Sequence, residues 1–440
     1  MKNKTTPLSP AKIIALGFLT VIACGTLLLS LPAAHSEEVD VSLLDAFFSS
    51  VSAVCVTGLV TVDTGAAYSF FGQLVIAVLI QIGGLGITSI SAGFVVLLGG
   101  KLSTRENSLV REALNYPTYN GIKPMIRSVV LLDFSIEALG AVLSFFTFVR
   151  DYPLPKALWL SVFHSIAAFN NGGFDALGNG DSIGAYTHDV WFNFVTCILI
   201  VVGGLGFFVI RELLNRANAK IHRREAGKLS LHTKVVLMVT SVLILGGAVV
   251  IKLTEGGNIS VMGALFASIT ARTAGFATYP ISGFSNAGII VMCVLMFIGA
   301  SPGSTGGGVK TTTAFVLVKR LVSVMTGREA RVFRRKIKDE AMSKAFIIIS
   351  LGLTWVLIQT AAMSLFDPDI PLRDILFEQV SGFGTTGLST SITPSLSVPS
   401  KLILIVTMYV GRLGPLTIAT LWSAKKQSAV SRPEGEIPIG

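Results

Sequence analysis

Residues 376–388 read LFEQVSGFGTTGL, and three earlier stretches of the chain follow the same plan. These are residues 44–59 (LDAFFSSVSAVCVTGL), 162–174 (VFHSIAAFNNGGF) and 265–276 (LFASITARTAGF). Each is largely apolar and ends in an aligned glycine followed by Leu or Phe; the four glycines are Gly58, Gly173, Gly275 and Gly387. Four such matches, spaced roughly 100 to 115 residues apart, indicate an internal repeat.

The chain around these stretches has the composition of an integral membrane protein. Hydrophobic residues make up 51% of its 440 residues and charged residues only 14%, against about 25% charged in ordinary soluble domains. Mean hydropathy is +0.71. Several apolar runs, such as 13–31 and 231–252, reach the roughly 20 residues that a helix needs to cross the hydrocarbon core. The first run lacks a small-residue cleavage site, so we interpret it as a span and not as a signal peptide.

The glycine-ended stretches are too short to cross a membrane, and each lies between two longer apolar runs. We therefore predict an all-α membrane protein of four parallel repeats, each a span, a re-entrant pore helix with its glycine loop, and a second span, around a pseudo-fourfold axis. Each repeat crosses twice, so all four share one orientation, unlike inverted-repeat carriers. The expected spans are 12–31, 70–99, 124–149, 190–213, 231–253, 285–325 with an interruption, 343–366 and 399–423. The expected repeats are residues 1–100, 101–217, 218–330 and 331–440, the last including a C-terminal tail.

The formal net charge of +10 is distributed in a way that argues for a membrane topology and against nucleic-acid binding. Lys and Arg concentrate in alternate loops, at 101–127, 211–228, 319–338 and 425–426, while the loops between them, at 37–45, 151–189 and 367–374, are acidic or mixed. This is the positive-inside pattern, and it predicts a multi-pass protein of the cell inner (plasma) membrane with both termini in the cytoplasm. The densest cluster, 331–338, is either a plain topology signal or a contact for a partner protein or anionic membrane lipid.

The four glycine loops suggest a cation pathway. Non-helical backbone persists at membrane depth only where it is buried in protein or lines a wet cavity. A ring of backbone carbonyls can replace the hydration shell of a cation, glycine reaches the positive φ that such a backbone needs, and the preceding helix points its negative end at the ion. Uncharged loop residues favour a monovalent ion over a calcium-type carboxylate ring. The alternative is that glycines only allow close helix packing, which we favour for Gly83, Gly84, Gly203 and Gly204.

At these motifs the sequence resembles the Ktr/Trk/HKT superfamily of potassium transporters, and within it the membrane subunit of bacterial Ktr uptake systems. The resemblance spans nearly the whole chain and implies potassium uptake, often sodium-stimulated, by a homodimer with one pore per subunit. It also implies a cytoplasmic nucleotide-binding (RCK-type) regulatory ring, no catalytic activity, and no bound cofactor beyond transported K⁺, with Na⁺ a further candidate. The implied filter residues are Thr57, Gly58, Asn171, Gly172, Gly173, Thr273, Ala274, Gly275, Thr385, Thr386 and Gly387. In HKT relatives a serine at the first filter position accompanies sodium selectivity, so Gly58 favours potassium.

The second span of the third repeat is interrupted by Pro302 and clustered glycines, which break a helix. In the family this segment is an intramembrane gate below the filter. The expected gate residues are Gly303, Ser304, Thr305, Gly306, Gly307, Gly308, Lys310 and Arg412. A phosphate-binding loop is excluded because Val309 separates Gly308 from Lys310 and no strand precedes the segment. Arg412 lies in an apolar run, so we expect it to face the bundle interior and to donate to the carbonyls of the gate.

Other charged residues in apolar segments have no assigned role. Asp133 and Glu137, four residues apart, are expected to face protein or a cavity, and Arg272 and Glu378 are candidates to pair behind the filter. A different class of protein, an ion-coupled carrier for another solute, would need inverted repeats with discontinuous helices at a midplane site. An enzyme would need a nucleophile, metal or phosphate constellation, and the sequence offers none.

The charge pattern predicts that the loops at 216–228 and 331–338 face the cytoplasm. In a cysteine-free background, Lys220→Cys and Lys336→Cys should react with a membrane-impermeant thiol reagent only after the cells are permeabilised. Glu37→Cys, in an acidic loop, serves as the control that reacts in intact cells. Labelling of either cytoplasmic position from outside intact cells would overturn this topology.

Overall fold

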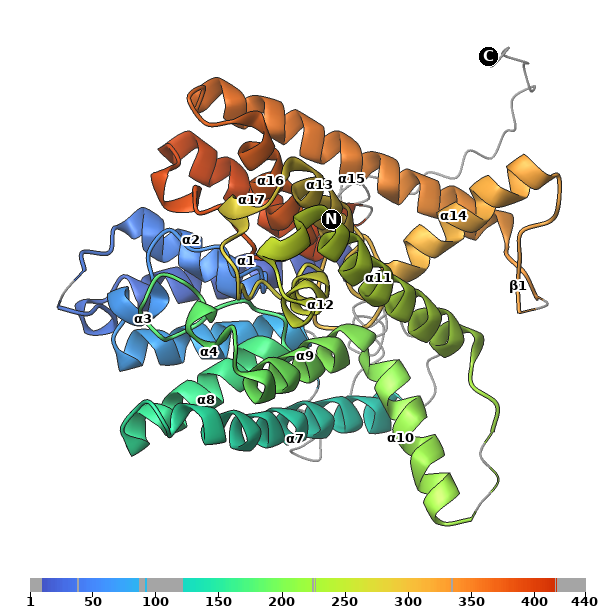
Figure 1. Ribbon diagram of the computed structural model, residues 1–440, viewed down its shortest axis with the longest axis horizontal. Coiled ribbons are helices and arrows are strands. Elements are labelled where there is room, and N and C mark those ends of the chain that lie inside the picture. The colour runs from blue at the N-terminus through green and yellow to red at the C-terminus, as the bar shows by residue number, and fades with distance from the viewer. Residues whose placement is uncertain are drawn as a thin grey trace, which may run out of the picture.

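The computed structural model describes residues 10–37, 39–86, 92, 122–223, 225, 227–333, 335–415 and 417, and this part of the chain is almost entirely helical (Figure 1). The main elements are α1 (Pro10–Leu29), α2 (Leu43–Val54), α3 (Thr64–Ala67), α4 (Phe70–Leu85), α7 (Ile122–Phe148), α8 (Leu154–Phe169), α9 (Val190–Leu205), α10 (Phe207–Ile221), α11 (Leu231–Glu255), α12 (Val261–Thr270), α13 (Asn286–Phe297), α14 (Thr311–Thr326), β1 (Arg331–Val332), β2 (Arg335–Lys336), α15 (Asp339–Phe366), α16 (Leu372–Gly384) and α17 (Val398–Leu413).

Four of the described helices are long and apolar enough to cross a membrane. They cover Ala11–Leu29, Pro124–Phe148, Leu231–Asn258 and Asp339–Phe366, close to four of the eight predicted spans. Each is followed by a short helix, as the sequence predicts; α2, α8 and α12 are apolar, and α16 also carries charged residues. Figure 1 shows the segments of successive quarters of the chain grouped in turn, with blue α1 to α4, teal to green α7 to α9, yellow-green to olive α11 to α13 and orange to red α15 to α17.

The second helix of each group, α4, α9, α13 or α17, ends inside its predicted span. The helices α4, α9 and α17 end at Gly86, Gly206 and Gly414, whose φ values of +79°, +90° and +86° cannot continue a right-handed helix. At Gly206 the chain turns by 104° into α10, so the expected span over 190–213 is bent within its range, a break that the sequence did not predict. The predicted interruption of 285–325 is confirmed, because α13 ends at Phe297 and α14 begins at Thr311. The expected spans 70–99 and 399–423 extend past their breaks largely beyond the described residues.

Serine side chains join three of the short helices to the preceding long helix by hydrogen bonds. Ser50 Oγ donates to Ile22 O at 2.8 Å, Ser165 Oγ to Glu137 O at 2.7 Å, and Ser268 Oγ to Ile244 O at 2.8 Å. A serine that satisfies its hydroxyl on a neighbouring helix backbone holds two helices at close range without burying an unpaired polar group. These bonds fix the depth at which each short helix enters the bundle.

A second set of bonds joins the region after each long helix to the start of the second helix of the same group, α4, α9, α13 or α17. Ser69 Oγ donates to Ala33 O at 2.6 Å, Ser285 Oγ to Glu255 Oε1 at 2.7 Å, and Ser397 Oγ to Asp367 Oδ2 at 2.9 Å. In the remaining group Arg150 pairs with Asp189, the N-cap of α9. Every one of these residues lies at an N-cap or next to a helix end, where backbone groups need partners.

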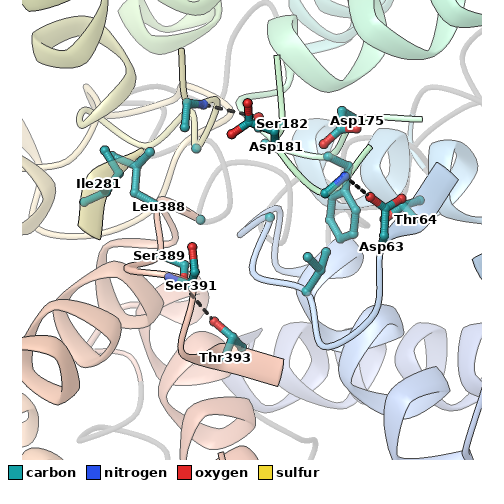
Figure 2. Close-up of a pocket in the computed structure, with 18 of the residues that line it drawn as sticks. Asp63, Thr64, Asp175, Asp181, Ser182, Ile281, Leu388, Ser389, Ser391 and Thr393 are labelled. Atoms are coloured by element: carbon teal, nitrogen blue, oxygen red, sulfur yellow. Dashed lines mark hydrogen bonds between the residues drawn. The ribbon is translucent and has the colours of Figure 1, made fainter. Parts of the chain in front are cut away.

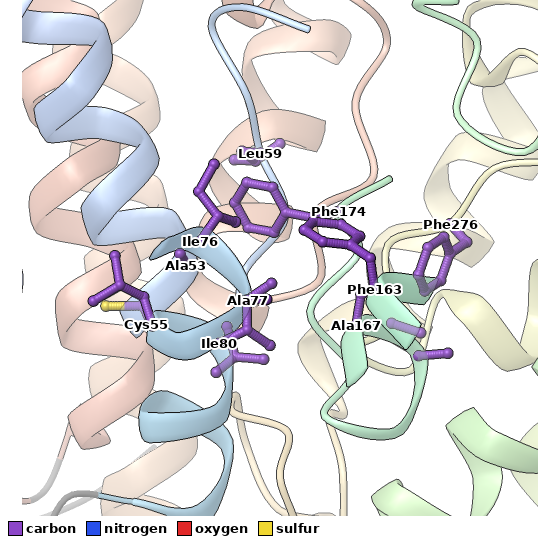
Figure 3. Packing of buried hydrophobic residues seen from close by; sticks show 14 of the residues in the cluster. Ala53, Cys55, Leu59, Ile76, Ala77, Ile80, Phe163, Ala167, Phe174 and Phe276 are labelled. Atoms are coloured by element: carbon purple, nitrogen blue, oxygen red, sulfur yellow. The ribbon is translucent and has the colours of Figure 1, made fainter. Parts of the chain in front are cut away.

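A layer of large apolar side chains surrounds the glycine loops from behind (Figure 3). Phe163, Phe174 and Phe276 are fully buried together with Leu59 and Ile76, and they come from α4, α8 and three of the loops. Close-packed aromatic side chains leave little room for the loops to shift. The core of the fold is therefore built around the loops.

The helices α10 and α14 and the hairpin β1–β2 lie at one end of the molecule, on the right of Figure 1. The basic cluster of 331–338 forms that hairpin, with Arg331 opposite Lys336 and Val332 opposite Arg335. Glu212 on α10 accepts from the backbone N–H of Ser230 at 2.6 Å and from the hydroxyl of Thr233, which joins α10 to the start of α11. At this end, with its basic loops, α10 is therefore held to the start of α11 by hydrogen bonds.

Candidate functional site: a ring of four glycine loops

The four loops after α2, α8, α12 and α16 meet in a closed ring. A Cβ added to Gly58 would lie 2.6 Å from Gly172 O, and one added to Gly173 would lie 2.8 Å from Ala274 O. A Cβ on Gly275 would collide with Thr386 O, and one on Gly387 would collide with Thr57 O, which returns to the first loop. Each aligned glycine therefore abuts the carbonyl that precedes the glycine of the next loop, and the fourth contact closes the ring.

All four loops have the same backbone pattern. The aligned glycines have φ values of +92°, +67°, +86° and +92° in chain order. The residue two positions earlier also has positive φ: Val56 at +56°, Asn171 at +58°, Thr273 at +80° and Thr385 at +50°. Alternation between left- and right-handed residues turns successive peptide groups toward one side, so this backbone can present a row of carbonyls to the axis.

Positive φ at the β-branched residues Val56, Thr273 and Thr385 is strained, at roughly 1 to 3 kcal/mol each, and persists only where surrounding contacts enforce it. Sequence reasoning assigned positive φ to the glycines alone and left Val56 out of the site. No local signal in the sequence marks Val56, because its conformation follows from the ring and not from its own preference.

The amide groups of the loops are bonded to the helices behind them. Thr57 N–H donates to Ser52 O at 2.8 Å and Gly58 N–H to Ser52 Oγ at 3.0 Å. Thr386 N–H and Gly387 N–H make the same two bonds to Ser381, at 2.9 and 3.1 Å. With the donors turned outward, the carbonyls are left for the axis. Neither serine is among the predicted site residues, although each stands six residues before its glycine, a shared spacing that could have marked them.

A cavity of about 290 Å³ opens on one side of the ring (Figure 2). All four aligned glycines line it, and the side chains of Asp63, Asp175 and Asp181 stand around its mouth. Asp63 accepts from Gly180 N–H at 2.6 Å and Asp175 from Leu177 N–H at 3.2 Å, so the backbone holds both carboxylates in place. Negative side chains at the entrance of a confined cavity raise the local concentration of cations. The sequence placed Asp175 and Asp181 in an acidic loop but did not place them at the ring.

Asp175 is the acidic residue nearest the ring in sequence, two positions after Gly173. Burial, with Asp63 as a negative neighbour, raises the pKa of the Asp175 carboxyl to about 6. This carboxyl therefore changes charge near pH 6, in a mildly acidic range.

The predicted gate segment covers the other side of the ring. Gly307 N–H donates to Thr385 Oγ1 at 3.0 Å, and a Cβ on Gly306 would collide with the side chain of Thr273. The segment is also bonded to the break after α9, through Ser301 N–H to Gly204 O at 3.1 Å and Phe207 N–H to Gly303 O at 3.0 Å. It thus lies directly beneath the side chains of two loops.

Two cationic side chains hold the carbonyls of this segment. Lys310 Nζ donates to Gly306 O at 2.6 Å and to Gly307 O at 3.3 Å. Arg412 donates to Thr305 O, and its other nitrogen donates to Gly83 O and Gly84 O at the end of α4. The predicted contact of Arg412 with the carbonyls of the gate segment is confirmed.

The suggested pairing of Arg272 with Glu378 is wrong. Glu378 accepts hydrogen bonds from Ser389 Oγ and from Thr393 Oγ1 at 3.0 Å. Within the described ranges Arg272 forms no ion pair, and its buried Nε has no partner. The two side chains point in different directions. Glu378 points toward Ser389 and Thr393, which follow the fourth loop, while Arg272 lines a small crevice beside α9 and α11.

The packing interpretation is confirmed for three glycines of the second helices. A Cβ on Gly83, Gly84 or Gly203 would collide with Val54 O, Asn170 or Phe169 O respectively. Only Gly204 has room for a methyl group, with its nearest neighbour, Asn171 Nδ2, at 3.5 Å. The backbones of α4 and α9 therefore approach the ends of the pore helices α2 and α8 closely.

The ring, its polar mouth and the bundle of apolar helices define a multi-pass membrane protein that transports cations. The family model described as "Cation transport protein" (TrkH) matches residues 10–432. This chain belongs to the TrkH family of cation transport proteins and is not an enzyme.

Several relatives and one solved structure are similar over nearly their full lengths. "Ktr system potassium uptake protein B" of Bacillus subtilis is 35% identical, with 98% of this chain and 97% of the relative covered. "Potassium/sodium uptake protein NtpJ" of Enterococcus hirae is 34% identical, with 98% of each covered. The crystal structure of the potassium transporter TrkH from Vibrio parahaemolyticus superposes with a TM-score of 0.73 at 18% identity, covering 96% of this chain and 86% of that one.

The pKa of Asp175 predicts a dependence on outer pH. Above about pH 6 the carboxylate is charged and attracts cations; below it the carboxyl is protonated and the attraction is lost. Cation uptake at low outer concentration should fall about two- to fivefold between pH 7 and pH 5, as expected for roughly 0.4 to 1 kcal/mol. Asp175→Asn should lower uptake at pH 7 and flatten the profile. Asp369→Asn, on an exposed loop, should leave both unchanged; an unaltered profile in Asp175→Asn contradicts the assignment.

Proposed function

We propose that this chain takes up potassium across the cell membrane through the ring of four glycine loops, with Thr57, Gly172, Ala274 and Thr386 supplying carbonyls. The observation that carries the proposal is the closure of the ring, in which each of these carbonyls abuts the glycine of a neighbouring loop. In the first and fourth loops the N–H donors are turned outward to Ser52 and Ser381, which leaves the carbonyls available for a cation. The names of the relatives, "potassium uptake" and "potassium/sodium uptake", support the same ion class.

The architecture proposed with this function is four parallel repeats, over residues 1–100, 101–217, 218–330 and 331–440, with eight spans and both termini cytoplasmic. Its support is the recurrence of one plan: a long helix, a short helix, a loop with positive φ at the same two positions, and a second helix that breaks at its inner end. An ion-coupled carrier for a larger solute is the alternative, and the cavity above the ring, at about 290 Å³, narrows onto backbone and not onto a solute pocket.

The segment 303–308, with Lys310 and Arg412, is proposed as the gate. Its Gly307 N–H donates to Thr385 Oγ1, and its Gly303 O accepts from Phe207 N–H at the start of α10. Movement of α10 would therefore be transmitted to the segment. A cytoplasmic nucleotide-binding ring, as the resemblance implies, would act from the end that carries α10, α14 and the basic hairpin. A homodimer, stimulation by sodium, and the lack of a resident cofactor beyond the transported ion belong to the same proposal.

Gly58→Ser should weaken discrimination between potassium and sodium, because a side chain at a φ of +92° would collide with Gly172 O and displace the carbonyl ring. The purified protein in liposomes should take up rubidium, and sodium should compete about tenfold better in the variant, the change expected from roughly 1.4 kcal/mol of lost discrimination. Gly283→Ser, where an added Cβ meets no atom, is the control. A wild-type protein that carries no rubidium sinks the proposed function itself, and unchanged competition in Gly58→Ser removes Gly58 from the filter.

Deleting residues 303–308 should raise rubidium flux and reduce its dependence on any regulatory subunit, because the segment covers an otherwise intact ring. Arg412→Ala should act in the same direction more weakly, since it frees Thr305 O but leaves the bonds of Lys310. Lys156→Ala, which alters an exposed cation in the first turn of α8, serves as the control. If folded, membrane-inserted deletion protein shows wild-type or lower flux, the segment is not a gate and its glycines serve helix packing.

A further inference from the structure

The helix α7 carries two acidic side chains that the proposed pathway does not use. Asp133 is 0% exposed and Glu137 only 5% exposed. Four residues apart on a helix, they lie one turn above each other on the same face. No lysine, arginine or histidine forms an ion pair with either carboxyl in the part of the chain that the structure describes. Burying unpaired carboxyls in a membrane helix is costly, and such residues are retained where they serve the pathway.

A chain of hydrogen bonds leads from these carboxyls to the second glycine loop. Gln81 on α4 donates its amide to Asp133 Oδ2 and accepts from Asn170 Nδ2 at 3.1 Å. Asn170 Nδ2 also donates to Glu137 Oε1 at 2.7 Å. Ser165 on α8 donates to the backbone of Glu137 as well. Three helices are thus joined at the side chain of Asn170.

Asn170 is the C-cap of α8 and the first residue of the loop that ends at Gly173. Its side chain fills the space beside Gly84, where an added Cβ would lie within 3.0 Å of the Asn170 Cβ. The next residue, Asn171, is held in the left-handed region and its side chain contacts Thr273 of the third loop at 3.1 Å. The loop is therefore fixed from behind by the carboxyls and from the side by its neighbour.

This support is specific to one loop. The residues at the corresponding position, three before the aligned glycine, are Cys55, Arg272 and Gly384 in the other loops. None of these three residues has a side-chain amide that could donate to Gln81 and Glu137 as Asn170 does. The carbonyl of Gly172 abuts Gly58, so a rotation of Asn170 would move a carbonyl of the ring.

We infer that Asp133 and Glu137, acting through Gln81 and Asn170, are positioning residues that set the carbonyls of the second loop and thereby the discrimination between potassium and sodium. The inference rests on the proposed function, because it concerns the same ring. A purely structural role would lower the yield or thermal stability of the protein and leave the ion selectivity of the folded fraction unchanged.

The test measures rubidium uptake into liposomes, with sodium as competitor, on protein that is monodisperse by size exclusion. Glu137→Leu removes one of the two side-chain acceptors of the Asn170 amide and should let sodium compete about tenfold better, equivalent to about 1.4 kcal/mol. Glu137→Gln keeps a side-chain oxygen and should stay within about twofold of wild type. Ser144→Ala, at a buried polar residue of the same helix, is the matched control.

Non-additivity supplies the second readout. Asn170→Ala should change selectivity by itself, and the double variant with Glu137→Leu should lose less than the sum of the two single losses, because the two residues share one hydrogen bond. Should Glu137→Leu fail to fold, Gln81→Leu removes the other acceptor of the Asn170 amide together with the donor to Asp133, and should shift the competition by sodium in the same direction. Folded Glu137→Leu or Gln81→Leu with wild-type competition overturns the inference, as does an equal loss in Glu137→Gln. Both outcomes are distinct from failure of the proposed function, in which the wild-type protein itself takes up no rubidium.

Discussion

The structure depends on one constraint: four stretches of non-helical backbone must stay at membrane depth with every amide donor satisfied. In hydrocarbon an unpaired backbone group costs several kcal/mol. The donors of Thr57, Gly58, Thr386 and Gly387 are satisfied by the serines of the helices behind them. The carbonyls of Thr57 and Thr386 lie against Gly387 and Gly275 of the neighbouring loops, where they contribute to the ring. The apolar layer of Phe163, Phe174 and Phe276 then fixes the loops in that arrangement.

The four loops are alike in backbone and different in what supports them. The first and fourth use a serine six residues before the glycine, the second uses the amide of Asn170 held from α4 and α7, and the third uses Thr270, whose hydroxyl donates to Phe276 O at 2.7 Å. A fourfold ring built from one chain can therefore be adjusted loop by loop. This is why a change in α7 can affect one carbonyl position while leaving the other three loops intact.

The sequence was sufficient to predict the elements that depend on local composition. Apolar length predicted the long helices α1, α7, α11 and α15, and the aligned glycines predicted where the loops lie. The bend at Gly206 was missed because the apolar run continues through it; its positive φ goes with a tertiary bond, Phe207 N–H to Gly303 O, that no local pattern encodes. Val56 was not predicted because its positive φ also depends on tertiary contacts. The pairing of Arg272 with Glu378 is wrong because similar positions in the aligned repeats do not determine the direction of a side chain.

The inner side of the ring combines a steric and an electrostatic barrier. Arg412 is a permanent cation, and it bridges Thr305 O of the gate segment to Gly83 O and Gly84 O of α4. A cation leaving the ring would meet this charge as well as the segment. Because Arg412 has two attachments, displacement of the segment alone frees one set of donors and leaves the guanidinium anchored to α4. If the segment is the gate, as proposed, the opened pathway would keep a positive charge at its wall, which would limit how long a cation remains beneath the ring.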